Sequence, residues 1–392
     1  MELNEEFFAF INEHLYAYTD RLLFSASRYH SVDVAKAVEQ ILIRRRLKTK
    51  LPAWTAHEKL FFPSRIAAEQ CSSDITAKYK QSLIKGATLC DLTGGMGVDA
   101  YYFSQCVERV TYVERNTDYA EAAARNFEIL GATNIQVLNA DATEIAPRIE
   151  AVTFYIDPAR RSAANKRLFA LHDCEPDVLQ MKAALLNKGA RVIIKVSPMA
   201  DIEETLRLLP ETCEVHIISV GNECKELLFV LENAAVGDVN VFTINYTSAG
   251  DVQQFRFHWN EEKTAQADYA SEINKYLYEP NASVMKSGAF KLAAARYSLK
   301  KLHRHSHLYT SSELTDNFAG RIFSVEEVLP FSKQTLKTLS DRYPQANITC
   351  RNFPLTTDTL RQRMHIKDGG NVYIFATTFA SDTKVIIVAR RG

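Results

Sequence analysis

The first 75 residues carry apolar side chains at the three- and four-residue spacing that is typical of amphipathic helices. The two clearest runs are Phe7, Phe8, Ile11 and Leu15, followed by Val34, Val38, Ile41 and Leu42. The pattern predicts an N-terminal helical region over residues 1–75. A basic run, Arg44-Arg45-Arg46 with Lys48 and Lys50, ends this block and has two interpretations. It either complements the dipole at a helix C-terminus or faces phosphate.

Short apolar runs alternate with helical segments from Thr88 to Glu232, which is the sequence form of a parallel α/β sheet. The predicted strands are Thr88–Asp91, Arg109–Val113, Ile135–Leu138, Thr153–Ile156, Ala190–Lys195, Val215–Val220 and Leu227–Leu231. The predicted helices are Val98–Gln105, Thr117–Leu130, Pro176–Asn187 and Ile202–Leu208. We therefore expect an α/β fold with a Rossmann-like sheet of seven strands within residues 76–260.

Two stretches of alternating polarity, Val239–Asn245 and Gln254–Trp259, flank a turn at residues 248–251 and predict an antiparallel hairpin that ends this domain. The rest of the chain has the pattern of small α+β units, over residues 276–321 and 322–392. The elements predicted there are a helix over Ala289–Leu302, a strand over Ile322–Leu329, a helix over Ser332–Tyr343, a strand over Asn347–Asn352, a helix over Thr356–Met364 and strands over Val372–Phe379 and Lys384–Ala389.

Composition excludes several classes of protein. Of the 392 residues, 46% are hydrophobic and 24% are charged, which excludes a disordered or fibrous chain. No apolar run approaches the roughly 18 residues of a membrane span, and the acidic N-terminus does not resemble a signal peptide. The seven cysteines are scattered and form no CxxC pair, which favours free thiols over a disulfide framework or a zinc ribbon. We expect a cytoplasmic protein without a metal.

Charge is distributed unevenly although the net charge is zero. The segment from Tyr276 to Gly392 holds 17 Lys and Arg against 9 Asp and Glu, whereas the first 275 residues hold 30 against 38. Because segregated positive charge attracts polyanions, the C-terminal part is predicted to contact nucleic acid. The alternative is a basic face that keeps a small domain soluble. The candidate RNA-binding residues are Lys300, Lys301 and Arg304, which follow Lys291 and Arg296 of the predicted helix.

Side chains that suit a nucleotide ligand follow four successive predicted strands. The first strand ends at Asp91 and leads into the loop Leu92-Thr93-Gly94-Gly95-Met96-Gly97, whose glycines let the backbone approach a ligand at a helix N-terminus. Glu114, Asp141 and Asp157 follow the next three strands. Glu114 suits ribose hydroxyls and Asp141 an adenine amino group, while Asp91 suits the ammonium of a bound amino acid. Each feature alone has a simpler explanation as an ordinary turn or a helix cap, but together they predict one site.

Residues 65–235 resemble a class I S-adenosylmethionine-dependent methyltransferase. The loop from Asp91 to Gly97 is similar to that family's D-x-G-x-G-x-G loop, with Thr93 in place of the first glycine. The residues that this resemblance implies for binding S-adenosyl-L-methionine are Asp91, Thr93, Gly94, Gly95, Gly97, Glu114 and Asp141. Asp157-Pro158-Ala159-Arg160 resembles the D-P-P-Y/W and D-P-P-R signatures of nucleic-acid methyltransferases, with Ala159 in place of the second proline. This implies a reaction site at Asp157, Pro158 and Arg160.

The whole chain also resembles bacterial proteins in which this core carries a C-terminal ferredoxin-like segment and a THUMP-like domain. The stretches that carry this resemblance are Glu69-Gln70, Gly94–Ala100, Asp157–Arg161, Glu223–Leu227, Tyr278–Ala282 and Val328–Phe331. The family implies a methyltransferase that acts on RNA, and it agrees with the basic C-terminal part because THUMP domains are RNA-binding modules. The resemblance does not imply which base or atom is methylated.

Two basic residues near the predicted reaction site have open assignments. Arg161 suits a phosphate with its planar guanidinium, or else forms a surface ion pair. Lys195 ends the fifth strand, and a lysine at a buried sheet edge requires a carboxylate partner or an anionic ligand.

Cysteine and histidine chemistry is also left open. Cys174 and Cys224 are either nucleophiles for methylation at carbon 5 of a pyrimidine or buried thiols without a reaction. His303, His305 and His307 alternate, so a strand would place them on one face, as a zinc site or as a solvated or phosphate-facing cluster.

Two rival functions remain at this point. The spacing Gly95-x-Gly97-x-x-Ala100 also fits a dinucleotide-dependent oxidoreductase. The departures at Thr93 and Ala159 also allow a non-catalytic RNA-binding protein with a degenerate methyltransferase fold.

Overall fold

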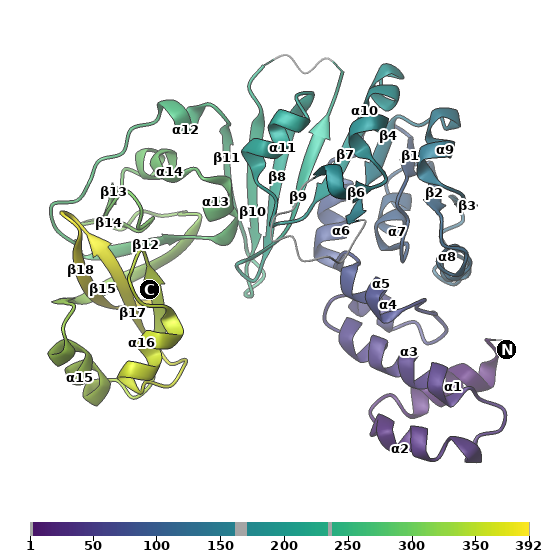
Figure 1. The fold of residues 1–392 in the computed structure, drawn as a ribbon, viewed down its shortest axis with the longest axis horizontal. Helices are drawn as coiled ribbons and strands as arrows, with labels where there is room; N and C mark the ends of the chain where they lie inside the picture. The colour runs from purple at the N-terminus through teal and green to yellow at the C-terminus, as the bar shows by residue number, and fades with distance from the viewer. Residues whose placement is uncertain (1–2, 161–170, 234–236, 392) are drawn as a thin grey trace. The chain divides into compact units, whose positions relative to one another are not determined.

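The computed structural model describes residues 3–160, 171–233 and 237–391. The chain divides into two compact units (Figure 1), Met1–Thr212 with Leu228–Ala235 and Cys213–Leu227 with Val236–Gly392. The first unit contains the N-terminal helices and the strands whose carboxyl ends carry the predicted site.

The predicted N-terminal helical region is confirmed. Its helices are α1 Glu5–Glu13, α2 Thr19–Phe24, a 3-10 turn at Ala26–Arg28, α3 Val34–Leu47, α4 Pro52–Thr55, α5 Arg65–Gln70 and α6 Asp74–Gln81. Polar side chains begin several of these helices, since Asn4, Asp33 and Ser64 each accept a backbone N–H of the first turn. The predicted apolar positions of α1 and α3 pack together in one core that includes Phe7, Ile11, Val38 and Ile41.

The basic run at the end of α3 joins loops to the helix. Arg44 is buried and donates to three backbone carbonyls of the loop after α4. Arg45 donates to two carbonyls of the turn after α1, and Arg46 pairs with Glu69 of α5. The three arginines lie in the last turn of α3, as the helix-dipole interpretation predicts, and the guanidinium groups of Arg44 and Arg45 also satisfy backbone carbonyls of this region.

The central sheet has nine strands: β1 Thr88–Asp91, β2 Arg109–Glu114, β3 Ile135–Asn139, β4 Thr153–Ile156, β7 Arg191–Val196, β8 Thr212–Val220, β9 Glu223–Leu231, β10 Asn240–Tyr246 and β11 Val252–His258. Their order is β11-β10-β8-β9-β7-β4-β1-β2-β3. All seven predicted strands are present, and the predicted hairpin is confirmed as the antiparallel pair β10 and β11. This hairpin extends the expected seven-stranded sheet to nine, because β10 pairs in parallel with β8.

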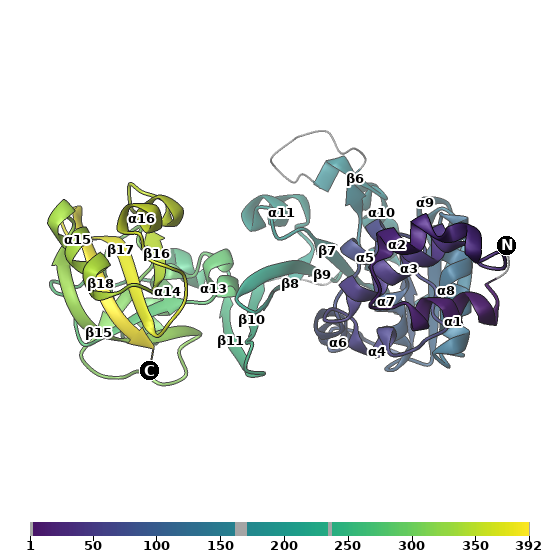
Figure 2. The same cartoon turned by 90° about the horizontal axis from the view of Figure 1, so that it is seen from below.

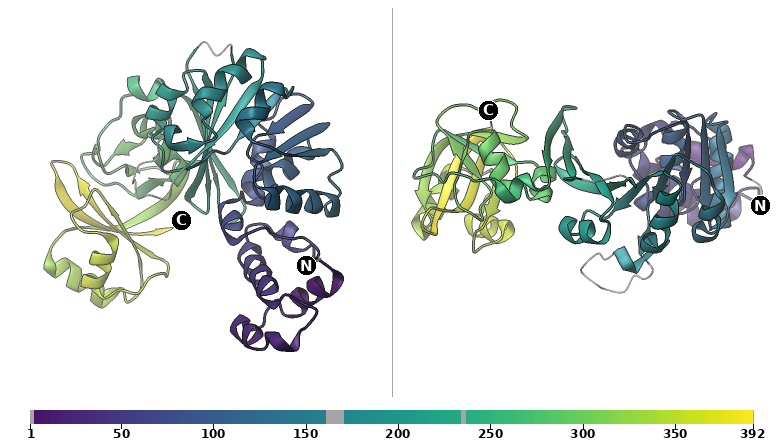
Figure 3. Two further views of the ribbon diagram at one scale, coloured as in Figure 1. Left: turned by 45° about the vertical axis from the view of Figure 1, so that its right-hand side comes forward. Right: turned by 90° about the horizontal axis from the view of Figure 1, so that it is seen from above.

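The topology places the predicted site residues along one edge of the sheet. Strands β3, β2, β1, β4 and β7 are all parallel, and β1 lies between β2 and β4, where the chain order reverses. Ligands of open α/β sheets bind at such a switch point, outside the carboxyl ends of the strands. Helices cover both faces (Figures 2 and 3), with α10 Val178–Asn187 and α11 Ile202–Leu208 on one face and α6 with α7 Val98–Ser104 on the other.

The remaining helices of the first unit follow β2 and β3. They are α8 Thr117–Ile129, α9 Ala142–Ile145 and a 3-10 turn at Ala146–Arg148. After β4, the chain forms a two-stranded ribbon of β5 Ala159–Arg160 and β6 Cys174–Glu175, preceded by a 3-10 turn at Leu171–Asp173. A core that contains Trp54 and Phe62 also contains Met96, Val98 and Tyr102, so the N-terminal helices pack directly on the glycine loop and α7.

The second unit contains a seven-stranded sheet of order β13-β14-β12-β15-β18-β17-β16. Its elements, after the short helix α12 Glu261–Thr264, are β12 Tyr276–Pro280, α13 Ala282–Ser287, α14 Phe290–Arg296, β13 Lys300–Lys301, β14 Tyr309–Ser311, β15 Gly320–Pro330, α15 Lys333–Arg342, β16 Asn347–Arg351, α16 Thr357–Met364, β17 Val372–Phe379 and β18 Thr383–Arg391. The elements predicted from Ile322 onward are confirmed. The predicted helix over Ala289–Leu302 is wrong beyond Arg296, because Ser298 adopts a left-handed φ of 54° and Lys300–Lys301 then pairs with β14.

Candidate functional site at the carboxyl ends of the parallel strands

The glycine loop after β1 folds tightly against β2. The Gly94 N–H donates to the Val113 carbonyl at 2.8 Å, and a Cβ at Gly94 would lie 2.2 Å from the Tyr112 ring. Gly97 has a φ of 84° and begins α7, where the Phe127 ring would meet a Cβ at 2.7 Å. Both positions therefore require glycine, and the loop presents its backbone at the switch point of the sheet.

Glu114 fixes the middle of this loop. Its Oε2 accepts the Gly95 N–H at 2.8 Å, and its Oε1 accepts the Asn116 N–H at 2.8 Å. The Tyr112 hydroxyl donates to the Gly95 carbonyl at 2.6 Å from the same strand. The carboxylate predicted to bind ribose therefore also holds the glycine loop, and its position at the end of β2 is set by two backbone donors.

Asp91 is a buried acid at the end of β1. Its side chain accepts the Thr93 N–H at 3.0 Å, and the residue is 1% exposed. Burial raises the pKa of Asp91 to about 8, against the opposing effect of the Thr93 hydrogen bond, and the negative charges of Asp99, Asp157 and Glu114 raise it further. No ion pair joins Asp91 to another described residue. A cationic ligand group would stabilise its charged form.

The Asp91 carboxyl should make the stability of the ligand-free protein depend on pH. Its pKa is higher in the folded than in the unfolded protein, so the free energy of unfolding should fall as pH rises from about 4 to about 8. Asp91→Asn should reduce this decline and stabilise the ligand-free protein at pH 8. It should also lower the affinity for any ligand whose cationic group binds Asp91. Urea unfolding across this pH range measures the effect. Equal pH dependence in both proteins would contradict the assignment.

Asp157 connects the loop after β1 to the end of β7. Its Oδ2 lies 2.5 Å from Lys195 Nζ, and its backbone N–H donates to Thr93 Oγ1 at 2.7 Å. Lys195 thus has the carboxylate partner that its buried strand-end position requires. The Asp157 side chain is 36% exposed, so its carboxylate remains accessible to a substrate.

Thr93, which departs from the glycine pattern, has a clear structural role. Its hydroxyl accepts the Asp157 N–H, and its backbone N–H donates to Asp91. Hydrogen bonds therefore join the two halves of the predicted site through Thr93. One half holds Asp91, Glu114 and Gly95, and the other holds Asp157 and Lys195.

Other predicted site residues lie near this network with different contacts. Asp141 caps α9, because its Oδ1 accepts the Thr143 N–H at 2.8 Å, which is the simpler explanation that the sequence allowed. Pro158 follows Asp157, and Arg160 lies in the ribbon strand β5, whose backbone pairs with Cys174. Arg161 lies outside the described residues.

The sequence did not reveal a buried polar network around Asp99 of α7, the helix that follows the glycine loop. Lys80 of α6 is fully buried, with its Nζ 2.9 Å from Asp99 Oδ1 and 2.7 Å from Ser72 Oγ. The Tyr155 hydroxyl donates to the other Asp99 oxygen at 3.1 Å. Burial acts to raise the pKa of Asp99, but the charges of Lys80 and Lys195 outweigh it and hold that pKa below its ordinary value. Helical spacing gave no signal, because a lysine on an amphipathic helix is normally placed at the surface.

The candidate cysteines are poor nucleophiles. Cys174 is fully buried in β6, which keeps its thiol away from a substrate. Burial raises the pKa of the Cys224 thiol to about 11, although the charge of Lys286 opposes this. A thiol with so high a pKa is protonated near neutral pH, so neither cysteine has the character of an activated nucleophile.

The C-terminal basic residues do not form one helical face. Lys300 is exposed, but Lys301 is 2% exposed, donates to the Arg304 carbonyl and lies 5.6 Å from the centre of the Phe290 ring. Burial lowers the pKa of Lys301. The prediction that Lys301 contacts phosphate is therefore wrong, because its side chain is buried. Consecutive residues of a strand point to opposite faces, which explains the difference. Lys300 and Arg304 remain exposed candidates.

The three histidines lie outside the strands, so the expectation that a strand aligns them on one face is wrong. His303 Nε2 lies 3.2 Å from Asp382 Oδ1, and the ring centres of His303 and His305 are 5.7 Å apart. His307 stacks on Phe290 with ring centres 3.6 Å apart, and burial lowers its pKa to about 4. Within the described part of the chain, no group of three or more His, Cys, Asp or Glu residues could hold a metal ion, and no helix is long and apolar enough to cross a membrane.

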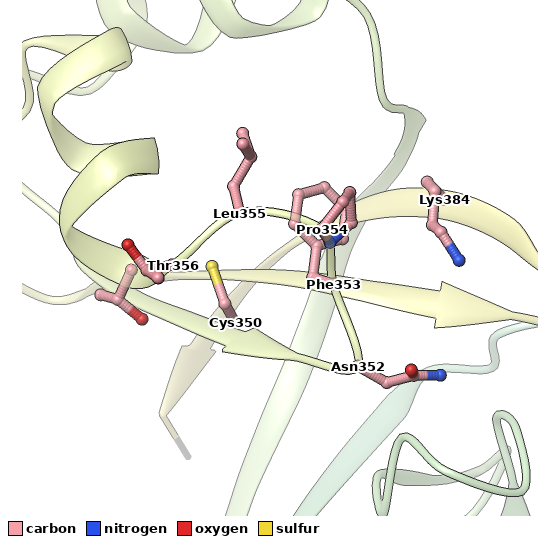
Figure 4. Close-up of a pocket in the computed structure, with 8 residues that line it drawn as sticks. Cys350, Asn352, Phe353, Pro354, Leu355, Thr356 and Lys384 are labelled. Atoms are coloured by element: carbon pink, nitrogen blue, oxygen red, sulfur yellow. The ribbon is translucent and has the colours of Figure 1, made fainter.

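The second unit has a pocket of its own. It has a volume of about 510 Å³, and its lining residues are Cys350, Asn352, Phe353, Pro354, Leu355, Thr356, Thr357 and Lys384 (Figure 4). The labelled side chains come from the end of β16, the following loop and β18. No residue of the strand-end site lines it.

Family models and solved structures both show similarity to this chain. Family models match residues 276–318 as a ferredoxin-like domain and residues 320–391 as THUMP domain-like. A crystal structure of a Porphyromonas gingivalis W83 protein, assigned as a methyltransferase, has a TM-score of 0.90 and 36% identity, with 100% of both chains covered. No curated protein sequence matches the chain.

Two more distant structures each match 40% of this chain. An rRNA methylase from Streptococcus thermophilus is 12% identical with a TM-score of 0.31, covering 40% of this chain and 94% of its own. A methyltransferase from Geobacter sulfurreducens is 15% identical with a TM-score of 0.31, covering 40% and 77%.

Proposed function

This chain belongs to the family of the Porphyromonas gingivalis protein, with which it shares its full length and 36% of its residues, and we propose that it is an S-adenosylmethionine-dependent methyltransferase that acts on RNA. The observation that carries the proposal is the hydrogen-bonded arrangement at the switch point of the sheet. There, the ends of β1, β2 and β4 bring Asp91, Glu114 and Asp157 around one glycine loop.

The residues present fit S-adenosylmethionine. Asp91 is a buried carboxyl without an ion-pair partner among the described residues. The ammonium group of the methionine part of the cofactor would supply a positive partner for it. Glu114 uses one lone pair of each oxygen on backbone donors and can accept ribose hydroxyls with the others. Asp141 lies after β3, within reach of an adenine amino group in this assignment. The backbone of Thr93, Gly94, Gly95 and Gly97 would line the methionine and ribose. The bound cofactor supplies an electrophilic methyl group.

The chain's own residues position the nucleophile. The Asp157 side chain lies 2.5 Å from Lys195 Nζ and is partly exposed, so its oxygens can accept an N–H or O–H of the target base. Thr93 Oγ1 fixes the Asp157 backbone relative to the loop after β1. Pro158 and Arg160 continue this segment toward the substrate. Methyl transfer is an in-line displacement, so alignment by these groups supplies much of the rate enhancement.

RNA as the substrate is supported by the C-terminal region. Residues 320–391 match a THUMP domain-like family, and residues 276–392 hold eight more basic than acidic side chains. The exposed residues Lys300 and Arg304 are candidates for phosphate contacts. Lys195, which is paired with Asp157, is a further candidate for contact with a substrate phosphate. Arg161, which follows Arg160 in the sequence, is another candidate.

Glu114→Ala should weaken S-adenosylhomocysteine binding by roughly 2 kcal/mol, because charge-assisted bonds to ribose are lost and the Gly95 N–H loses its acceptor. Isothermal titration calorimetry measures this. Titration with NAD tests the oxidoreductase alternative, for which tight NAD binding and absent S-adenosylhomocysteine binding would be required. An unchanged affinity for S-adenosylhomocysteine in Glu114→Ala would remove this residue from the cofactor site.

A further inference from the structure

The N-terminal helical region exposes aromatic rings beside cations. The exposed fractions of Tyr16, Tyr18 and Phe24 are 74%, 77% and 91%. Lys48 Nζ donates to the Tyr16 hydroxyl at 3.0 Å and lies 5.2 Å from the centre of that ring, and the Arg21 guanidinium lies 5.3 Å from the Tyr18 ring. Exposed rings that alternate with cations are the arrangement that binds the bases and phosphates of single-stranded nucleic acid.

A cleft with three arginines continues this surface. It lies between α3 and α5, has a volume of about 330 Å³ and is lined by Leu42, Ile43, Arg45, Arg46, Arg65 and Ala68, none of which is acidic. Arg45 donates to the carbonyls of Leu15 and Ala17, so the cleft adjoins the turn that carries Tyr16. Arg46 is 58% exposed in its pair with Glu69, and Arg65 is exposed. Guanidinium groups in such a cleft suit a phosphodiester.

The cleft and the glycine loop share one hydrophobic core within the first unit. Lys50 Nζ donates to the carbonyls of Ala68 and Glu69 at the end of α5. Ala68, which lines the cleft, packs in the same core as Met96 of the glycine loop. This packing connects the cleft to the loop that carries the strand-end site.

We propose that the cleft between α3 and α5 binds the phosphodiester backbone of single-stranded RNA next to the target nucleotide, with Tyr16 and Tyr18 stacked on neighbouring bases. This rests on the proposed function and adds a second RNA-binding surface, in the N-terminal region, to the basic C-terminal region. Cations beside the Tyr16 and Tyr18 rings favour RNA over an apolar protein surface, which would leave these charged groups desolvated and unpaired.

Salt-dependent binding separates the two parts of this surface. The probe is fluorescein-labelled oligouridylate, bound to the full chain over a series of potassium chloride concentrations. Arg46→Gln with Arg65→Gln should lower affinity about tenfold at low salt and flatten the log–log slope by about 1.4, for two lost phosphate contacts on a single strand. Tyr16→Ala should lower affinity by about tenfold with an unchanged slope, because it removes stacking and no charge.

The matched control is Lys59→Gln, which removes an equally exposed cation paired with Glu5 in the same region. It should leave both affinity and slope unchanged. Every variant should bind S-adenosylhomocysteine as the wild type does, which shows an intact core. If the cleft and Tyr16 variants bind RNA like the control, the proposal is wrong although the methyltransferase assignment stands. A wild type that neither binds nor methylates RNA overturns both. The same variants are titrated with polyglutamate as a second probe. If they lose polyglutamate binding but keep RNA binding, the proposal is also wrong, and the cleft binds an acidic protein partner instead.

Discussion

Asp157→Ala should reduce methyl transfer to RNA by about 10²–10⁴-fold and change S-adenosylhomocysteine affinity by no more than about threefold. The carboxylate is partly exposed at the end of β4 and is held by Lys195 at 2.5 Å, and in the proposed function it accepts a hydrogen bond from the target base. The variant retains the backbone N–H that donates to Thr93, so the loop after β1 should keep its shape. Transfer of a radioactive methyl group and calorimetry measure the two quantities.

The matched control for this prediction is Asp201→Asn. Asp201 is an acid of the same unit that caps α11 by accepting the Glu204 N–H at 2.8 Å. Its replacement should leave methyl transfer unchanged. Loss of cofactor binding together with transfer in Asp157→Ala would assign the carboxylate to the adenosine pocket or to folding. Undiminished transfer would place the reaction elsewhere in the molecule.

Lys80→Ala should lower the free energy of unfolding by about 3–5 kcal/mol, because it leaves the Asp99 carboxylate buried without its cation. Lys80 is fully buried, 2.9 Å from Asp99, and also donates to Ser72. Urea unfolding measures the loss. Lys78→Ala, on the exposed side of the same helix, should change stability by less than about 0.5 kcal/mol. Equal losses in both variants would show that the buried pair contributes nothing specific.

The Lys80 effect should also depend on pH. The pKa of Asp99 is lower in the folded protein, so the pair stabilises the fold above the ordinary value of 3.8 and loses this contribution as pH falls through the lower folded-state value. The difference in unfolding free energy between wild type and Lys80→Ala should therefore shrink below about pH 4. A difference that stays constant with pH would contradict an ion pair between these residues.

The sequence predicts the fold well because the central strands are buried on both faces. Within these strands, runs such as Phe154–Ile156 and Val192–Ile194 are apolar and fully or almost fully buried, so hydrophobicity locates the centre of each strand. The helix predicted over Ala289–Leu302 is too long for a different reason. Leucine and lysine at positions 299–302 have good helix propensity, but Ser298 adopts a left-handed φ and Lys300–Lys301 pairs with β14.

The candidate site is predictable only where its residues follow strands. Asp91, Glu114 and Asp157 are brought together because parallel strands share one edge, and the chain order alone gives that result. The pairing of Lys195 with Asp157 needs the register of β4 with β7. The Lys80–Asp99 pair and the arginine cleft depend on how α3, α5 and α6 pack, and no local pattern in the chain specifies which lysine becomes buried.

The most direct test of the central claim is methyl transfer itself. RNA is isolated from cells of the native host that lack the gene, incubated with purified protein and S-adenosylmethionine labelled in its methyl group, and digested to nucleosides for mass spectrometry. We expect one methylated nucleoside, which wild-type protein forms and Asp157→Ala does not, and which is present in RNA from cells that keep the gene. S-adenosylhomocysteine binding without transfer to any RNA would contradict the account and would indicate a non-catalytic protein with a methyltransferase fold.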